Sequence, residues 1–446
     1  MKTALALTLL SSLAAFGQDP DGGADLVPST GFFAPPPFAD AGEVPTVVDA
    51  GVLDGALSAT PSRGFPTSGS GSGDPALMID AASTLSVGGY AELVAGLTQT
   101  GPAAPFVATA NLRRVSLGVS KRLSPSWRLY LEYELENAIT CASCRGLSEL
   151  EQAYVEWQAV DAIGVRAGLV LTPMGIQQRI HEPTLYNGVS RPLVELAVIP
   201  STWRELAVGV YGSLAGRVRY ELYATSAPSP EKLNREGFID GRAFGSFARF
   251  NGPALEGRVE GEPLRGLTVG ASFYGGDMGP NTQTYDENGK KVAVSLPLLS
   301  YELDAQFNWR GVRAKGLWVQ FFMPNAGALL NAYKADGSPF FSDPEATGVP
   351  PRRMQGGYLE LSYDVLRFFD AGGMQLYPFA RLEVVDTQAL VPTGFAPDPR
   401  FHLTDWVFGL SFLPHRAVVV KADVTTRNRL RGDDEVLLNL GVGVVF

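Results

Sequence analysis

The last residues of the chain, Glu435 to Phe446, alternate between two sides of an extended strand. One side is apolar throughout, whereas the other carries Glu435, Asn439 and two glycines. Such a strand needs an apolar environment along one whole face, either lipid around a β-barrel or the core of a soluble sandwich. The remainder of the sequence must decide between these two environments.

The N-terminus has the pattern of a secretory signal peptide. Met1 and Lys2 precede an apolar run from Ala4 to Leu13, and Ala15–Gly17 supplies the small residues of a cleavage site. This run is too short to span a bilayer. We therefore expect residues 1–17 to be removed from an exported protein.

Composition excludes several classes of protein. Beyond the N-terminus, no window offers about twenty uninterrupted apolar residues, which argues against an inner-membrane helical protein. The net charge of −10 and the lack of a basic stripe argue against a nucleic-acid partner. Two cysteines cannot build a disulfide scaffold, and the 50 glycines suit a protein of strands and turns.

Residues 18–83 differ in character from the rest of the chain. They are rich in Pro, Gly, Ser, Ala and Asp and include Pro35–Pro37 and a Ser-Gly repeat at 68–73. Such a segment buries too little apolar surface to offset its ordering entropy, so we expect a disordered periplasmic segment. A folded plug inside a barrel is the alternative, but no hydrophobic periodicity supports it.

From Thr84 to Phe446 the hydrophobic period is two, and we expect about sixteen strands long enough to cross a bilayer at a tilt. In 127–136, for example, Trp, Leu and Tyr alternate with Arg and Glu. The count becomes fourteen or eighteen if the region 243–261, expected to contain the eighth strand, is wrongly merged or split. The predicted fold class is all-β.

The connections between these segments alternate between short and long. Short turns are expected near 123–125, 161, 213–214, 263–264, 310–311, 369–373 and 414–415, and the long connections include 173–202, 227–242 and 324–351. This rhythm favours a transmembrane antiparallel up-and-down barrel with long extracellular loops over a Greek-key sandwich. An even strand count returns Phe446 to the periplasmic side, where its strand would pair with the segment from Thr84 to Leu97 and close the barrel.

Charged residues on the strands identify the face that meets water. An Arg or Lys on the lipid face near the midplane costs about 2–4 kcal/mol, so the charged face is expected to line the lumen. Pairing across neighbouring strands is the alternative role for any one of these residues. The expected lumen residues are Arg128, Glu132, Glu134, Gln152, Glu156, Arg166, Arg219, Glu221, Arg258, Glu302, Asp304, Arg313, Lys315, Glu360, Asp364, Arg381, Glu383, Lys421 and Asp423.

The connection 173–202 is the expected third extracellular loop, and it is too apolar to extend into solvent. A long apolar loop in a compact domain must pack against something, so we expect it to fold into the lumen and form a constriction. Its cations could form a small anion site, which its carboxylates could also neutralise. The candidate residues of this constriction are Arg179, His181, Glu182, Arg191, Glu195 and Arg204.

Several motifs resemble the porins related to the phosphate-selective porins O and P: Leu150–Trp157, Val165–Gly175, Arg191–Glu195 and Pro200–Leu206. The resemblance implies a sixteen-stranded outer-membrane pore, a homotrimer, and passive diffusion of small hydrophilic solutes or anions. The closing strand similarly resembles that of other outer-membrane barrels, which implies that Phe446 is the assembly signal read by the barrel-assembly machinery. Phosphate selectivity in the family depends on stacked Arg and clustered Lys, whereas this chain has eight Lys and a single Lys pair.

The remaining motifs support no enzyme and no cofactor. Of the three histidines, His402 and His415 have no evident nucleophile beside them, and a Ser/His/carboxylate set around His181 is an alternative that no motif supports. Cys141 and Cys144 are expected to form a small disulfide in the second extracellular loop, because metal binding would need further ligands. The predicted function is that of a passive porin; the alternative is a structural or adhesive surface barrel with a blocked lumen.

Overall fold

The structure is a computed structural model that describes residues 85–138, 146–180, 182–341 and 348–446. The expected signal peptide, the segment 18–83, His181 and both cysteines lie outside the described residues. Among the described residues, no helix is long and apolar enough to cross a membrane.

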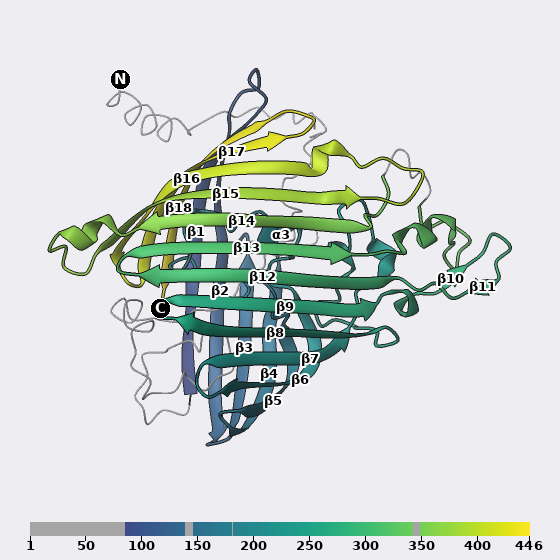
Figure 1. Cartoon of the computed structure of the whole chain (residues 1–446), viewed down its shortest axis with the longest axis horizontal. Helices are drawn as coiled ribbons and strands as arrows, with labels where there is room; N and C mark the ends of the chain where they lie inside the picture. The colour runs from purple at the N-terminus through teal and green to yellow at the C-terminus, as the bar shows by residue number, and fades with distance from the viewer. Residues whose placement is uncertain (1–84, 139–145, 181, 342–347) are drawn as a thin grey trace, which may run out of the picture. The chain divides into compact units, whose positions relative to one another are not determined.

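Sixteen antiparallel strands form one closed barrel, in which each strand pairs with its neighbours along the chain and β1 pairs with β18 (Figure 1). The predicted fold class and strand count are therefore confirmed. The barrel strands are β1 (Leu85–Thr100), β2 (Val107–Ser124), β3 (Trp127–Glu136), β4 (Ser148–Val160), β5 (Ile163–Leu171), β6 (Arg204–Leu214), β7 (Val218–Ser226), β8 (Pro253–Leu264), β9 (Leu267–Asp277), β12 (Pro297–Trp309), β13 (Val312–Phe322), β14 (Arg353–Tyr363), β15 (Gln375–Leu390), β16 (His402–His415), β17 (Val418–Arg429) and β18 (Glu435–Val445).

The connections contain short elements of their own. A two-stranded hairpin in the fifth long loop lies at one end of the strands (Figure 1). A 3-10 helix lies in the sixth loop. These elements are β10 (Thr284–Tyr285), β11 (Lys291–Val292), α3 (Val194–Ala197), η1 (Pro230–Lys232), η2 (Ile239–Gly241), η3 (Gly279–Asn281), η4 (Ala326–Asn331), η5 (Val365–Phe368) and η6 (Pro399–Phe401).

The fourth loop is longer than the sequence suggests, because β8 begins only at Pro253. Residues 243–252, expected within a strand, belong to the loop between β7 and β8. Phe244 and Phe247 have φ angles of 52° and 51°, which no strand accommodates. Proline lacks a backbone N–H and is well placed as the first residue of a strand, so the pairing starts there.

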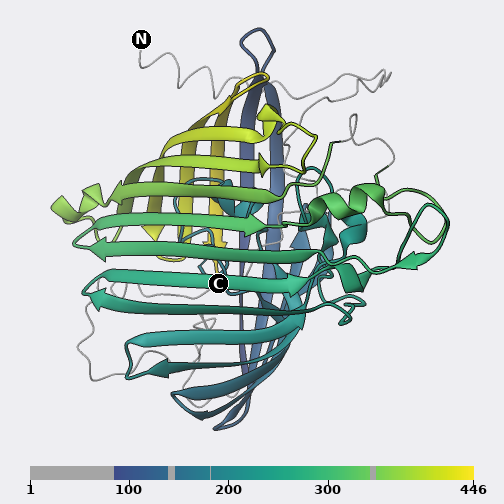
Figure 2. The ribbon, with the colours of Figure 1, turned by 45° about the vertical axis from the view of Figure 1, so that its right-hand side comes forward.

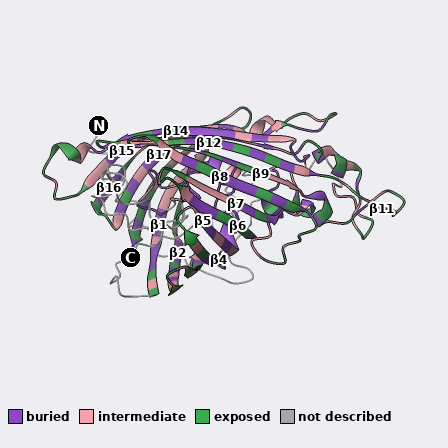
Figure 3. Cartoon of the chain, turned by 60° about the horizontal axis from the view of Figure 1, so that its bottom comes forward, coloured by how far each residue is buried: buried purple, intermediate pink, exposed green. Residues whose placement is uncertain are grey.

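Each strand has an exposed apolar row and a covered polar row, visible as alternating colours along β12 and β14 (Figure 3). In β12, Leu299, Tyr301 and Leu303 are exposed, whereas Glu302 and Asp304 are buried. Water would penalise such a continuous apolar outer surface, whereas a lipid bilayer matches it. The polar row faces the inside of the barrel.

The closing seam joins the two ends of the barrel domain. The pairs run from Tyr90 opposite Val445 to Thr100 opposite Glu435. Beyond them, Gly89 and Phe446 exchange two backbone hydrogen bonds of 2.9 Å each. The Phe446 ring covers Gly89 closely, so that any side chain at position 89 would meet it. Phe446 thus belongs to the seam itself.

We expect Gly89→Ala to destabilise the seam. The new Cβ would lie 2.8 Å from Cζ of Phe446 and would collide with the carbonyl oxygen of Ser116. Overpacking of this kind typically costs about 1–3 kcal/mol. The measurement is the urea midpoint of the folded, heat-modifiable band, with Gly275→Ala as the control, because its Cβ would make an ordinary 3.5 Å contact with Leu299. Equal midpoints for the two variants would contradict the prediction.

Candidate functional site

The third loop (residues 172–203), which joins β5 to β6, folds into the barrel as expected. Its apolar side chains Met174, Ile176, Val194, Val198 and Ile199 are fully buried. Figure 2 shows the ring of strands that surrounds the lumen, with α3 behind β13 and β14 in the view of Figure 1. A loop with this apolar content is stable inside the lumen because the wall and the other loops cover it.

An aromatic cluster anchors the C-terminal end of the third loop. The Trp203 ring lies 5.3 Å from Phe238 of the fourth loop, 4.8 Å from Tyr274 of β9 and 6.2 Å from Phe321 of β13, measured between ring centroids. All four side chains are buried. Aromatic pairs at these separations add to the free energy of area burial. The sequence places Trp203 beside the loop but offers no signal for its partners.

The tip of the third loop is fixed by hydrogen bonds to the wall near the closing seam. The Tyr186 hydroxyl donates to Glu92 of β1 at 2.9 Å. The backbone N–H of Val189 donates to Asp423 of β17 at 2.6 Å. Because the loop starts at β5 and ends at β6, these bonds show that it crosses the lumen.

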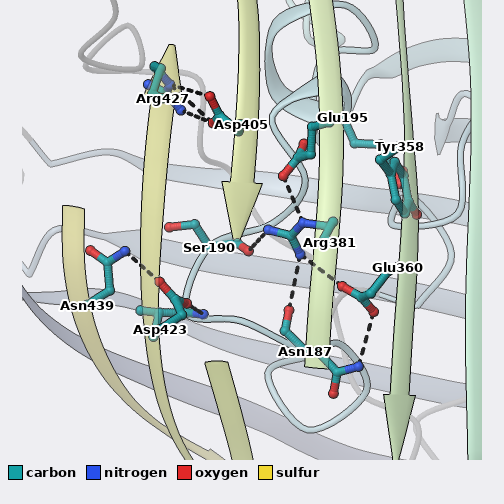
Figure 4. A network of polar contacts seen from close by, with 12 residues as sticks. Asn187, Ser190, Glu195, Tyr358, Glu360, Arg381, Asp405, Asp423, Arg427 and Asn439 are labelled. Carbon is teal, nitrogen blue, oxygen red and sulfur yellow. Dashed lines mark hydrogen bonds and ion pairs between the residues drawn. The ribbon is translucent and has the colours of Figure 1, made fainter. Parts of the chain in front are cut away.

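Arg381 of β15 connects the same tip to the neighbouring wall (Figure 4). Its guanidinium donates to the carbonyl oxygens of Asn187 and Ser190 at 3.4 and 3.3 Å and forms an ion pair of 3.0 Å with Glu360 of β14. The Asn187 amide donates to Glu360 at 3.1 Å. Charge-assisted bonds of this kind are stronger than neutral ones, so Arg381 fixes the position of the tip.

Glu195 in α3 connects two parts of the third loop and also connects this loop to the barrel wall. Its carboxylate accepts from the N–H of Gln177 at 2.6 Å and from the hydroxyl of Tyr358 of β14 at 3.0 Å. Burial raises the pKa of Glu195 to about 7, although both hydrogen bonds and Lys315 lower it, and Asp304 adds to the increase.

Two of the other expected constriction residues pair with different strands of the wall. Arg179 forms an ion pair with Glu260 of β8, whereas Arg204 forms one with Glu149 of β4 at 2.5 Å. Glu182 and Arg191 are buried. The two arginines therefore carry less free positive charge than expected, because each has a carboxylate partner that the sequence does not indicate.

The expected lumen residues lie on the inner face with one exception. Asp364 caps η5 in the turn after β14, where its carboxylate accepts from the N–H groups of Leu366 and Leu376; its position after the last apolar residue of the strand explains the wrong assignment. The buried inner residues are Glu132, Glu134, Gln152, Glu156, Arg166, Arg258, Glu302, Asp304, Glu360, Arg381, Glu383, Lys421 and Asp423. The half-buried ones are Arg128, Arg219, Glu221, Arg313 and Lys315.

Many of these charges form networks along the wall. Arg258 pairs with Glu302 at 3.2 Å and with Asp304 at 2.6 Å. Arg166 pairs with Glu156 at 3.0 Å and lies 4.5 Å from the Tyr154 ring. Buried charges are tolerated when they are paired in this way. Several of the expected lumen residues therefore have the alternative role, which is pairing with charges on neighbouring strands.

An acidic patch on the same wall is made of Glu132 and Glu134 of β3 and Glu149 and Glu151 of β4. Glu134 lies directly opposite Glu149, an arrangement of like charges that opposes strand pairing. A bulge in β4 near Glu151 shifts the register and brings an additional carboxylate to the patch. Arg204 contacts Glu149 at 2.5 Å and Glu151 at 3.7 Å. Strict alternation from Gln152 would place both Glu149 and Glu151 on the outer face, so the patch was not predicted from the sequence.

Among the described residues, no group of three His, Cys, Asp or Glu side chains is placed to hold a metal ion. His402 lies 3.2 Å from Asp386 at the extracellular end of β16, and His415 accepts from the N–H of Ala417 in a short turn.

A closed sixteen-stranded antiparallel barrel with an inward-folded third loop defines an outer-membrane porin fold. Three solved structures share it at low sequence identity. OmpF of Salmonella typhi has a TM-score of 0.52 at 11% identity and covers 81% of this chain and 97% of its own. The channel DcaP of Acinetobacter baumannii has 0.51 at 9%, covering 83% and 100%. The anion-selective porin of Comamonas acidovorans has 0.50 at 10%, covering 81% and 99%.

In sequence, the chain is 30% identical over 349 residues to an uncharacterised protein of Aquifex aeolicus (strain VF5), covering 76% of this chain and 74% of that protein. It belongs to the same family as that protein. No protein-family model matches the chain, so membership of the porin O and P family stays a prediction.

The pKa of Glu195 predicts a pH-dependent stability. Since the folded pKa of about 7 lies above the ordinary value of 4.5, this carboxyl stabilises the fold fully below pH 4.5, and the contribution is lost as the pH rises through 7. Complete loss corresponds to roughly 3 kcal/mol. We expect the urea midpoint of the wild type to decrease between pH 4.5 and 8, and that of Glu195→Gln to decrease less. Glu287→Gln in an exposed loop is the control; identical pH profiles for all three proteins would contradict the assignment.

Proposed function

We propose that the protein is a passive porin of the outer membrane that lets small hydrophilic solutes or ions diffuse through its lumen. The observation that supports this function is the third loop, which crosses the lumen and bonds to β1, β8, β14 and β17. Charged side chains line the remaining inner face. Nothing in this arrangement requires a cofactor or a chemical step.

The constriction is narrow in this proposal. The buried state of most charged wall residues indicates that side chains and the third loop fill much of the cross-section. Small ions are therefore the expected permeants, with a low conductance. The same observation favours the alternative function, a structural or adhesive surface barrel with a blocked lumen.

The ion preference is expected to differ from that suggested by the loop cations alone. Arg179 and Arg204 are each paired to a carboxylate, so neither offers a free cation to a permeating anion, whereas four carboxyl groups gather along β3 and β4. A ring or patch of carboxylates in a pore favours cations. We therefore propose a weak preference for cations, against the anion or phosphate preference that the family resemblance implies.

The assembled state is proposed from the same resemblance. A homotrimer in the outer membrane, exported with a signal peptide and inserted by the barrel-assembly machinery through the strand that ends at Phe446, accounts for the apolar outer face and for the closing seam. The periplasmic segment 18–83 would precede the barrel.

Electrical recording in planar bilayers tests the proposal. Purified protein is expected to give small stepwise conductances, and deletion of 176–198 is expected to increase the step several-fold. A milder variant is Tyr186→Phe with Asp423→Ala, which removes the bonds from the tip to Glu92 and Asp423. This variant replaces the deletion as the test if the deletion does not fold, and we expect it to increase the fluctuation of the current. Silent wild-type protein that retains heat-modifiable mobility would exclude the porin and favour the blocked barrel.

Ion preference is tested by the reversal potential in a tenfold KCl gradient. We expect a cation-selective potential for the wild type and a shift towards zero for Glu134→Gln with Glu149→Gln, since this variant removes two carboxyl groups from the acidic patch. Glu287→Gln in the fifth loop is the matched control and should leave the potential unchanged. An anion-selective wild-type potential would overturn the proposed preference.

A further inference from the structure

A turn of the fourth loop, residues 243–250, lies on the outside of the barrel. Leu169 belongs to the outward row of β5, because its cross-strand partners Ala153 and Leu206 are in rows that face away from the lumen. It is nevertheless only 7% exposed. A Cβ on Gly245 would lie 2.6 Å from Cδ1 of Leu169, so the turn covers this part of the outer face. We call residues 243–250 the outer turn.

The outer turn is fixed to the extracellular end of the barrel. The Phe244 ring lies 5.0 Å from the guanidinium carbon of Arg204 and 4.4 Å from that of Arg242. Arg204 is itself held by its ion pair with Glu149 of β4. These two cation–π contacts to one ring, together with the close contact at Gly245, hold the turn in place.

The backbone of the outer turn is strained in a way that directs a side chain outward. Phe244 and Phe247 both have left-handed φ angles, 52° and 51°. This conformation is disfavoured for bulky residues and persists only where the surroundings require it. Phe247 is 99% exposed and Phe250 is 55% exposed. Water penalises the exposure of these two aromatic rings, so they need an apolar partner.

The surroundings of the turn indicate what that partner is. Outward residues of the adjacent strand β6, Val208 and Val210, are exposed and belong to the apolar belt that meets lipid. From Ala243 to Phe250 the sequence contains three phenylalanines and no acidic residue. Aromatic residues at the edge of an apolar belt are typical of the interface between water and membrane.

We propose that the outer turn is an interfacial anchor, in which Phe247 and Phe250 insert into the acyl layer of the outer leaflet beside β5 and β6. The anchor extends the lipid-facing belt beyond the end of the strands. The third and fourth loops meet at the Trp203 and Phe238 rings, so the anchor is also attached to the loop that crosses the lumen.

Spin labels test this proposal in the full-length protein. In a Cys141→Ser, Cys144→Ser background, a nitroxide is attached to Phe247→Cys, and the protein is placed in dimyristoylphosphatidylcholine vesicles. The control for lipid is Leu303→Cys, an outward position that is 55% exposed. The control for water is Asp336→Cys, an exposed position in the sixth loop. Heat-modifiable mobility verifies that each variant is folded.

We expect the label at 247 to collide with oxygen about as often as the label at 303, and with nickel ethylenediaminediacetate several-fold less often than the label at 336. Frequent collision with the nickel complex would place the turn in water and overturn the proposal. Low collision with both reagents together with spin–spin broadening would assign the turn to contact with a second copy, which also overturns it. If Phe247→Cys does not fold, Phe250→Cys is read by the same criteria.

Discussion

The structure depends on one constraint, that a backbone within lipid must satisfy all of its hydrogen bonds internally. A sheet meets this requirement only when its first and last strands pair, which β1 and β18 do over the span from Tyr90 to Thr100. The final pair, Gly89 with Phe446, extends the seam to the last residue of the chain. Closure also fixes which row of each strand faces outward, because a register shift of one residue would place charges in lipid.

Closure leaves an interior that must then be filled or wetted, and this chain largely fills it. On the side of β9 and β13, apolar side chains of the third and fourth loops pack against Tyr274 and Phe321. Near the seam, the contacts of the third loop are instead polar, made by Glu92, Asp423 and Arg381. The wall charges around them form buried networks, which are favourable only while every partner is present.

The sequence was sufficient to predict the strands, their count and both faces, because alternation is local and its period of two survives any tertiary context. Contacts between distant segments have no such signal. The pairing of Arg179 with Glu260 and of Arg204 with Glu149 depends on which wall each loop residue reaches. The bulge near Glu151 breaks the alternation itself, and the phenylalanines of residues 243–250 imitate a strand while forming a turn. For these reasons the acidic patch and the outer turn became evident only in three dimensions.

The two attachments of the third loop differ in chemistry, and this difference bears on how a filled lumen can conduct. The aromatic and aliphatic attachment at Trp203, Val194 and Val198 buries several large side chains, each contributing about 1.5–3 kcal/mol. The tip is held by polar bonds from Tyr186, the backbone of Val189 and Arg381, which contribute roughly 1–3 kcal/mol each in net terms. Water can replace polar partners but not buried apolar ones. The lumen next to β1 and β17 is therefore the region where water can replace contacts of the loop.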